Sequence, residues 1–293
     1  MRWWTYQKER FPIFQHGLLV MAFSSSAVAF SALLCGISPG WQAFLVAFIT
    51  VFLFFLQLRI ADEFKDAEED AKYRPYRAVP RGLVSLRELG VMFAIAAAIQ
   101  LSLTLWLDTR LIYLLLLTWG YLALMSVEFF ARDWLKSRHI TYLWTHMLIM
   151  PLVDFFATSC LWLPAGVSPN PQGLLFFLIA SFFNGIVIEI GRKLRQPNGE
   201  QEGVPTYSKL WGLKKASRVW AVCMTITGFF ALLAAYHIGF FLPVICLLTP
   251  LLLWAYMTVS KFHKISSKRF ELIAGLWTLV LYLSLGLIPL LFK

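Results

Sequence analysis

Apolar runs of about 20 residues recur along the whole chain, and they constrain its fold more than any other feature. A helix of that length crosses a hydrocarbon core of roughly 30 Å. Backbone groups in lipid must hydrogen-bond to one another, so each run is predicted to be helical. Hydrophobic residues make up 59% of the 293 residues and charged residues 14%, against about half and a quarter in soluble domains. We therefore predict an all-α polytopic membrane protein, a bundle of helices around an apolar cavity, rather than a soluble protein.

Chain breakers divide these apolar runs into separate segments. We predict helices at 13–35, 41–60, 86–107, 110–131, 140–164, 172–191, 213–236, 238–259 and 270–291. Two connections, 61–85 and 192–212, are long and carry charges of both signs, and each follows the second helix of a set of four. We therefore predict one transmembrane domain over 1–293. It would contain an internal duplication, about 13–131 and 140–259, and a ninth helix at 270–291.

Basic residues fall almost entirely on alternate connections. Of the 26 Lys and Arg side chains, only Arg110 and Lys293 fall on the other side. Because basic loops stay in the cytoplasm, we predict a cytoplasmic amino terminus in an integral protein of the bacterial inner (plasma) membrane. Trp3 and Trp4 beside basic residues indicate an interfacial anchor rather than a cleaved signal peptide. The net charge of +10 is then a topology signal, with membrane lipid around the protein and no nucleic-acid partner.

The acidic residues at the start of the first long connection are regularly spaced. Asp62, Asp66 and Asp70 recur every four residues, which stacks three carboxylates on one helix face about 6 Å apart. Like charges at that spacing repel one another, and Mg²⁺, which shares a few carboxylates with substrate phosphates, would relieve the repulsion. The alternative is a solvated helix end in which neighbouring lysines and arginines are the partners.

A basic cluster follows the acidic residues directly. Lys72, Arg74 and Arg77 lie in a Lys-Tyr-Arg-Pro-Tyr-Arg stretch. Guanidinium groups bind phosphate oxygens through paired donors, so such a cluster beside a metal site suits a diphosphate. The simpler alternative is the ordinary positive charge of cytoplasmic loops.

This stretch resembles the first signature of the UbiA superfamily of intramembrane prenyltransferases, Asn-Asp-x-x-Asp-x-x-x-Asp followed by an Arg-Pro…Gly segment. Ala78 stands in place of the proline of that segment. The matching positions are Asp62 (in place of Asn), Glu63, Asp66, Asp70, Arg77 and Gly82. The helix count and the two motif loops also match the family over nearly the whole chain. The resemblance implies Mg²⁺ held by two aspartate-rich motifs that bind an isoprenoid diphosphate near the cytoplasmic face.

The second motif departs from the family pattern. Its acidic core is reduced to Glu189, with Arg192 and Lys193 where carboxylates are expected, although a closing Gly-Val-x-Thr stretch at 203–206 fits. Replacing carboxylates by cations removes metal ligands and supplies direct contacts to a diphosphate. The alternative is that Glu189 and Arg192 form a structural pair at a helix end.

Several polar side chains are predicted to lie within the membrane. His146 and Asp154, eight residues apart, would share one helix face, and Asn184 precedes Glu189 on its helix. Ionisable groups in a membrane usually face a cavity or a partner. The sequence also contains Glu128 and Arg132, whose spacing of four is typical of an intrahelical ion pair at a membrane edge.

We therefore expect a prenyltransferase that uses Mg²⁺ to transfer a prenyl group from an isoprenoid diphosphate to a lipophilic acceptor, with aromatic acceptors among the candidates. A membrane terpene cyclase acting without an acceptor is the first alternative, and a transporter with polar side chains along its path is the second. The predicted metal ligands are Asp62, Glu63, Asp66, Asp70 and Glu189, of which Asp66, Asp70 and Glu189 are the catalytic set; the predicted diphosphate contacts are Lys72, Arg74, Arg77, Arg192 and Lys193.

Overall fold

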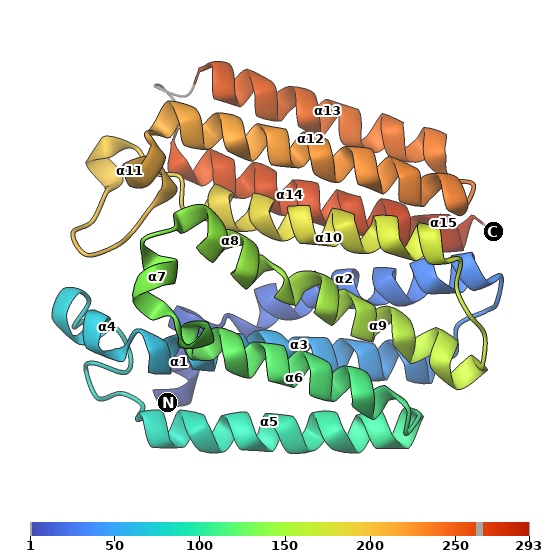
Figure 1. The fold of residues 1–293 in the computed structure, drawn as a ribbon, viewed down its shortest axis with the longest axis horizontal. Helices are drawn as coiled ribbons and strands as arrows, with labels where there is room; N and C mark the ends of the chain where they lie inside the picture. The colour runs from blue at the N-terminus through green and yellow to red at the C-terminus, as the bar shows by residue number, and fades with distance from the viewer. Residues whose placement is uncertain (1, 262–265, 293) are drawn as a thin grey trace.

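The computed structural model describes residues 2–261 and 266–292, and over these residues the chain forms helices and no strand (Figure 1). Eight helical segments of this described part are long and apolar enough to cross a membrane, and a ninth apolar helix, α6, is shorter. Lys264 and Lys293, two of the basic residues in the topology argument, lie outside the described residues. The eight long segments are α2 (Ile13–Cys35), α3 (Trp41–Lys65), α5 (Leu86–Leu107), α8 (His139–Met147) with α9 (Ile149–Ala165), α10 (Pro171–Arg192), α12 (Leu213–His237), α13 (Phe241–Ser260) and α14 (Ser267–Leu285) with α15 (Leu287–Leu291). The shorter helix α6 spans Leu111–Ser126.

Short helices gather at one end of the bundle, at the left in Figure 1. These are α1 (Arg2–Arg10), α4 (Ala67–Tyr73), α7 (Arg132–Lys136) and α11 (Tyr207–Trp211), with the single turns η1 (Glu128–Phe130) and η2 (Pro197–Gly199). The connections at the other end are short, and the carboxyl terminus lies there. The basic connections therefore share one end of the molecule, as their alternation along the sequence predicts.

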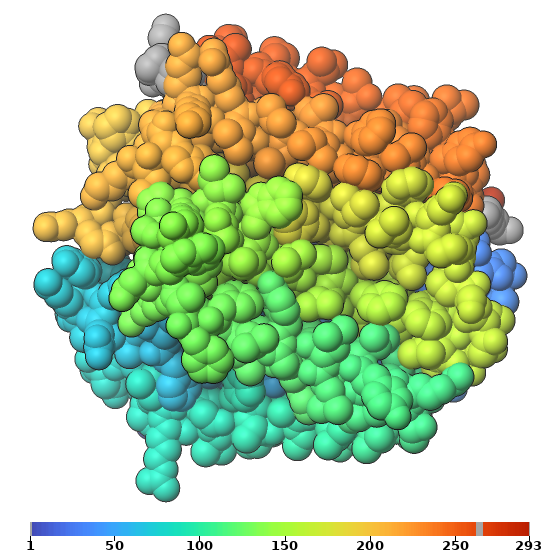
Figure 2. Space-filling view, viewed as in Figure 1, coloured from blue at the N-terminus to red at the C-terminus, as the bar shows by residue number. Residues whose placement is uncertain are grey.

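The interior of the bundle is formed by α2, α3, α9, α10, α12 and α14, whereas α5 and α13 expose most of their surface. Large aromatic side chains such as Phe54, Phe156 and Trp220 are fully buried between the inner helices. Close approach is possible where a side chain is missing: a Cβ on Gly286 would lie 2.1 Å from the backbone oxygen of Ser26. Side chains fill the space between the ribbons on the face that Figure 2 shows.

Three predicted helices are interrupted in the structure. The helix predicted at 270–291 is divided at Gly286 into α14 and α15. The helix predicted at 110–131 ends at Ser126, because Glu128, Phe129 and Phe130 have left-handed backbone angles, with φ of 51°, 52° and 57°. The helix predicted at 140–164 is divided at Leu148 into α8 and α9. In contrast, α3 extends beyond the predicted residue 60 to Lys65, which carries its last turn into the acidic motif. The predicted internal duplication remains a prediction.

Candidate active site

The first acidic motif spans the junction of α3 and α4. Asp66 ends α3 with φ −96° and ψ 7°, and its N–H still donates to the carbonyl of Asp62 at 2.9 Å. The N–H of Asp70 donates in turn to the carbonyl of Asp66 at 2.8 Å. The four-residue bonding pattern thus continues through the junction, although the backbone of Asp66 leaves the helical region.

Asp62 and Asp66 keep carboxylate oxygens available. The Asp62 side chain is 40% exposed and is only loosely paired, with Lys65 at 3.6 Å and Arg59 at 3.7 Å. The Asp66 carboxylate, which is partly buried, has no hydrogen bond or ion pair within the part of the chain that the structure describes. Burial raises the pKa of the Asp66 carboxyl group, and the Lys65 charge partly offsets this effect. A partly desolvated carboxylate without a partner is costly and favours a bound cation.

The other two acidic side chains of this motif are held by arginines. Asp70 is almost fully buried; Arg77 donates to its Oδ2 at 2.6 Å, and the Arg74 Nη2 lies 2.6 Å from its Oδ1. Glu63 is equally buried and forms an ion pair with Arg10 of α1. The structure therefore separates these four predicted ligands into two carboxylates without a close partner, Asp62 and Asp66, and two that fix basic side chains. The remaining predicted cation of this loop, Lys72, is exposed, with its ammonium 5.0 Å from the Tyr73 ring.

The second motif forms a tight acid–base cluster at the end of α10. The buried Glu189 carboxylate accepts a hydrogen bond from Arg192 Nε at 2.6 Å and lies 2.7 Å from Lys193 Nζ. The Arg192 side chain is 44% exposed, so its guanidinium reaches out of the bundle while one edge is held by Glu189. Glu189 thus positions both cations, as the structural alternative expected, and the cations remain accessible to a phosphate.

The two motif loops are in direct contact. Gly203 has a φ of 70° and packs on the ring of Tyr73, so that a Cβ at this position would lie 2.3 Å from the Tyr73 Cγ. A second contact joins α4 to α7, where Lys136 and Arg132 lie 2.5 and 3.6 Å from Glu69 Oε1. Arg132 therefore pairs with Glu69 rather than with Glu128, its predicted partner. Figure 2 shows the loops together at the same end, cyan for the first, green for α7 and gold for the second.

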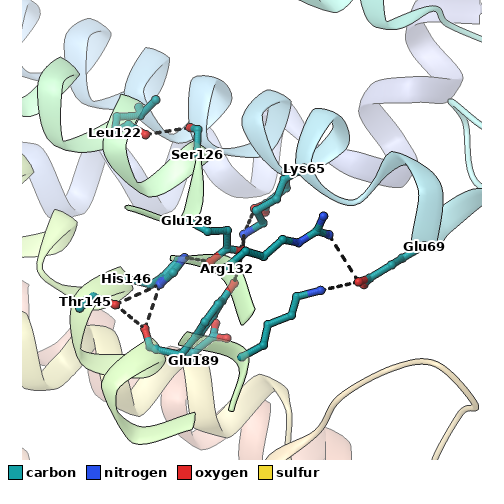
Figure 3. Close-up of polar contacts among 12 residues, drawn as sticks. Lys65, Glu69, Leu122, Ser126, Glu128, Arg132, Thr145, His146 and Glu189 are labelled. Carbon is teal, nitrogen blue, oxygen red and sulfur yellow. Dashed lines mark hydrogen bonds and ion pairs between the residues drawn. The ribbon is translucent and has the colours of Figure 1, made fainter. Parts of the chain in front are cut away.

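A polar cluster of four side chains adjoins the first motif (Figure 3). Its members are Lys65, Glu128, Tyr142 and His146. Lys65 Nζ lies 3.2 Å from the Tyr142 hydroxyl and 3.6 Å from Glu128 Oε1, and that hydroxyl donates to Glu128 Oε1 at 3.2 Å. His146 stacks on Tyr142, with ring centroids 3.9 Å apart. The left-handed turn at Glu128–Phe130, which costs about 1–2 kcal/mol per residue, places the Glu128 carboxylate in this cluster.

The deeper polar residues have separate partners. Asp154 accepts a hydrogen bond from the Tyr282 hydroxyl at 2.7 Å, and Asn184 accepts one from Thr278 at 3.1 Å. Because of the break at Leu148, His146 and Asp154 lie on different helices, α8 and α9, rather than on one face of a single helix. Among the described residues, no hydrogen bond or ion pair joins these pairs to the Glu128 cluster.

The acidic residues can be compared with the needs of Mg²⁺. Among residues 2–261 and 266–292, no three His, Cys, Asp or Glu side chains converge on one point. Mg²⁺ usually needs only one or two protein carboxylates, because waters and substrate phosphates complete its six oxygens. Two neighbouring carboxylates with free oxygens, Asp62 and Asp66, therefore fit a Mg²⁺ ion that arrives with a diphosphate.

Solved structures with the same fold are distant in sequence. A UbiA homologue from Aeropyrum pernix K1, without ligand, superposes with a TM-score of 0.66 at 14% identity over 88% of this chain and 94% of that one. A UbiA homologue from Archaeoglobus fulgidus bound to DMAPP and Mg²⁺ gives 0.56 at 12% identity over 93% and 97%. A digeranylgeranylglyceryl phosphate synthase in membranes gives 0.50 at 17% identity over 92% and 99%. These identities establish a shared fold only.

Comparison of sequences identifies the family. No curated protein sequence matches this chain significantly. The model of the UbiA prenyltransferase family, in contrast, matches residues 22–279, which include all of the long helices except the first residues of α2 and the end of α14 with α15. The match includes both motif loops, as the sequence resemblance predicted. This chain is an integral membrane protein that belongs to the UbiA prenyltransferase family.

Proposed function

We propose that this protein transfers a prenyl group from an isoprenoid diphosphate to a lipophilic acceptor, in a reaction that depends on Mg²⁺. Family membership supports prenyl transfer in general. The observation that carries the specific proposal is the Asp66 carboxylate, which is partly buried, has no partner among the described residues and lies beside the loosely paired Asp62. Such a group is arranged for a cation that the protein alone does not supply.

In this proposal Asp66 and Asp62 hold Mg²⁺, and Arg192 and Lys193 contact the diphosphate directly. When bound, Mg²⁺ neutralises charge on the leaving diphosphate. Arg192 and Lys193 add fixed positive charge, and Glu189 keeps them in place before the substrate arrives. Arg74 and Arg77 are held by Asp70 and fix the conformation of the first motif loop. The carbon–oxygen bond then breaks to give an allylic cation, which the apolar bundle shields from water.

The site would face the cytoplasm of a bacterial inner membrane. The support is that the basic connections and the candidate site share one end of the bundle (Figure 1), and basic loops stay on the cytoplasmic side. Prenyl diphosphates are charged, so a site near the membrane surface lets the diphosphate remain in water while the chain enters the bundle.

Purified protein incubated with dimethylallyl, geranyl, farnesyl and geranylgeranyl diphosphates tests the proposal. A lipid extract from membranes supplies acceptors, and release of diphosphate and the mass of the product are measured. The proposal expects release with at least one substrate and a product that joins two molecules. A product with the mass of the prenyl group alone would identify a cyclase instead. The absence of release from every substrate would contradict both enzymatic functions.

A further inference from the structure

The buried cluster behind the first motif contains two proton acceptors that face each other. His146 Nε2 lies 3.5 Å from Glu128 Oε2, and neither atom has a hydrogen-bond partner, although both are buried. Buried polar atoms are nearly always paired, so two unpaired acceptors at this distance need an explanation.

The tautomer of His146 follows from its other nitrogen. Nδ1 lies 2.9 Å from the backbone carbonyl oxygen of Tyr142, which can only accept a hydrogen bond. Nδ1 therefore carries the ring proton, and in the neutral ring Nε2 bears a lone pair. The lone pair of Nε2 and the oxygen of Glu128 then leave a space between them that suits one additional proton.

Lys65 connects the cluster to the candidate metal site, because its ammonium group contacts both Tyr142 and Asp62. Tyr142 is only partly buried, donates its hydroxyl proton to Glu128 Oε1 at 3.2 Å and accepts from Lys65 at 3.2 Å. The same Lys65 ammonium lies 3.6 Å from Asp62 Oδ1. A single ammonium group thus separates the phenol from the carboxylate proposed to hold Mg²⁺.

The position of the Glu128 carboxylate depends on a strained stretch of backbone. Three successive residues without glycine, Glu128 to Phe130, have left-handed angles. Strain of this kind persists where the surrounding structure fixes it, and it is concentrated at functional sites. Here its result is to direct the Glu128 carboxylate between Lys65, Tyr142 and His146, where a regular continuation of α6 would not place it.

We propose that Tyr142 removes the proton of the acceptor during prenyl transfer, and that the pair Glu128–His146 receives it. This inference rests on the proposed function and names the base of that reaction. As the acceptor forms its bond to the allylic carbon, its own proton passes to the Tyr142 oxygen and the electrons of that bond remain with the product. The Tyr142 proton moves to Glu128 Oε1, and rotation of the protonated carboxyl group then brings it to the side that faces His146 Nε2. The electrons of the broken carbon–oxygen bond leave with the diphosphate, and the pair returns its proton to water as the products depart.

Two variants separate proton removal from ionisation. Tyr142→Phe removes the group that contacts the acceptor, and Glu128→Gln removes the carboxylate that takes the proton. The glutamine amide can donate to His146 Nε2 and still accept from Tyr142, so this variant preserves the packing of the cluster. Tyr121→Phe is the matched control, because it removes a partly buried phenol of α6 that donates to the carbonyl of Thr145 on α8 at 2.6 Å.

The experiment uses a prenyl diphosphate labelled in its prenyl group and a membrane lipid extract as acceptor. Three quantities are measured: diphosphate released, label joined to lipid, and free prenol formed by water. Both variants should release diphosphate within a few-fold of the parent, while label in lipid falls about a hundredfold, the usual contribution of a general base, and prenol increases. Tyr121→Phe should keep the ratio of the parent.

The other outcomes overturn the inference. If transfer and diphosphate release fall together in both variants, the cluster only maintains the structure of the site. If the ratio is unchanged, the proton leaves by another route. A parent that releases diphosphate from no substrate refutes the proposed function itself, and the inference with it, so the two failures are distinguished by the parent alone.

Discussion

The contact between the two motif loops gives a quantitative prediction for Gly203→Ala. At φ 70° an alanine is destabilised relative to glycine by about 1–2 kcal/mol. Its Cβ would also lie 2.3 Å from the Tyr73 Cγ, well inside the roughly 3.5–4.0 Å of a normal carbon contact. Overpacking of this kind typically costs about 1–3 kcal/mol. The closed arrangement of the loops should therefore lose about 2–5 kcal/mol in total.

The effect of Gly203→Ala can be measured as a change in the KM for the prenyl diphosphate. If both motifs bind the diphosphate together, opening the contact lowers the fraction of protein that is competent to bind, and the apparent KM rises in proportion. We expect an increase of at least about tenfold for the prenyl diphosphate, with little change in thermal unfolding of the bundle. Gly199→Ala, in the same loop and with no atom within 4 Å of the added Cβ, is the matched control.

A double variant divides the effect into its parts. Adding Tyr73→Ala to Gly203→Ala removes the steric conflict and leaves the backbone term, so part of the loss in KM should be recovered. A Gly203→Ala protein with the KM of Gly199→Ala would refute the reasoning, because it would show that the loops do not act on the diphosphate together.

Three further predictions concern charge and topology. Arg192→Gln should reduce use of the diphosphate substrate by roughly ten- to a hundredfold while the dependence on Mg²⁺ stays hyperbolic; a sigmoidal dependence with an unaffected variant would indicate a second metal site. Because burial raises the pKa of Asp66, its carboxylate becomes protonated at a higher pH than an exposed aspartate does. The Mg²⁺ concentration for half-maximal rate should therefore increase as the pH is lowered, and a flat profile would count against Asp66 as a ligand. A reporter inserted at residues 165–171 should be found outside the cytoplasm, and a cytoplasmic reporter would reverse the assigned orientation.

Helix boundaries could be predicted where the signal is local. The predicted 13–35 and 86–107 match the structure to the residue. The first ends before Gly36, which adopts the left-handed conformation of a helix end, and the second begins after Ser85, whose side chain forms a capping box with Glu88. The early end of α6 could not be predicted, because Val-Glu-Phe-Phe contains no residue that favours left-handed angles and tertiary contacts fix the turn.

In the candidate site, too, local features could be predicted and features fixed by tertiary contacts could not. The spacing of Asp62, Asp66 and Asp70 is visible in the sequence and identifies the motif. Which acidic side chains of the motif are paired depends on residues outside α3 and α4. Arg10 of α1 pairs with Glu63, and Arg77 of the following loop pairs with Asp70. The Lys65–Tyr142 contact could not be predicted, because the two residues are 77 positions apart. The four-residue spacing of Tyr142 and His146 predicts only that these two rings share a helix face, and such a spacing is common on an apolar helix.

The central claim, that the first motif holds Mg²⁺ for the departure of a diphosphate, is tested most directly by comparing Asp66→Asn with Glu68→Gln. Glu68 is two residues from Asp66 and is exposed. Glu68→Gln therefore removes the same charge from the same loop and leaves the proposed ligands in place. Initial rates of diphosphate release from a labelled prenyl diphosphate are measured across Mg²⁺ concentrations. The account predicts parent-like release for Glu68→Gln and, for Asp66→Asn, roughly a hundredth of the parent rate or less in a protein that remains folded. Release within a few-fold of the parent by Asp66→Asn at all Mg²⁺ concentrations would contradict it.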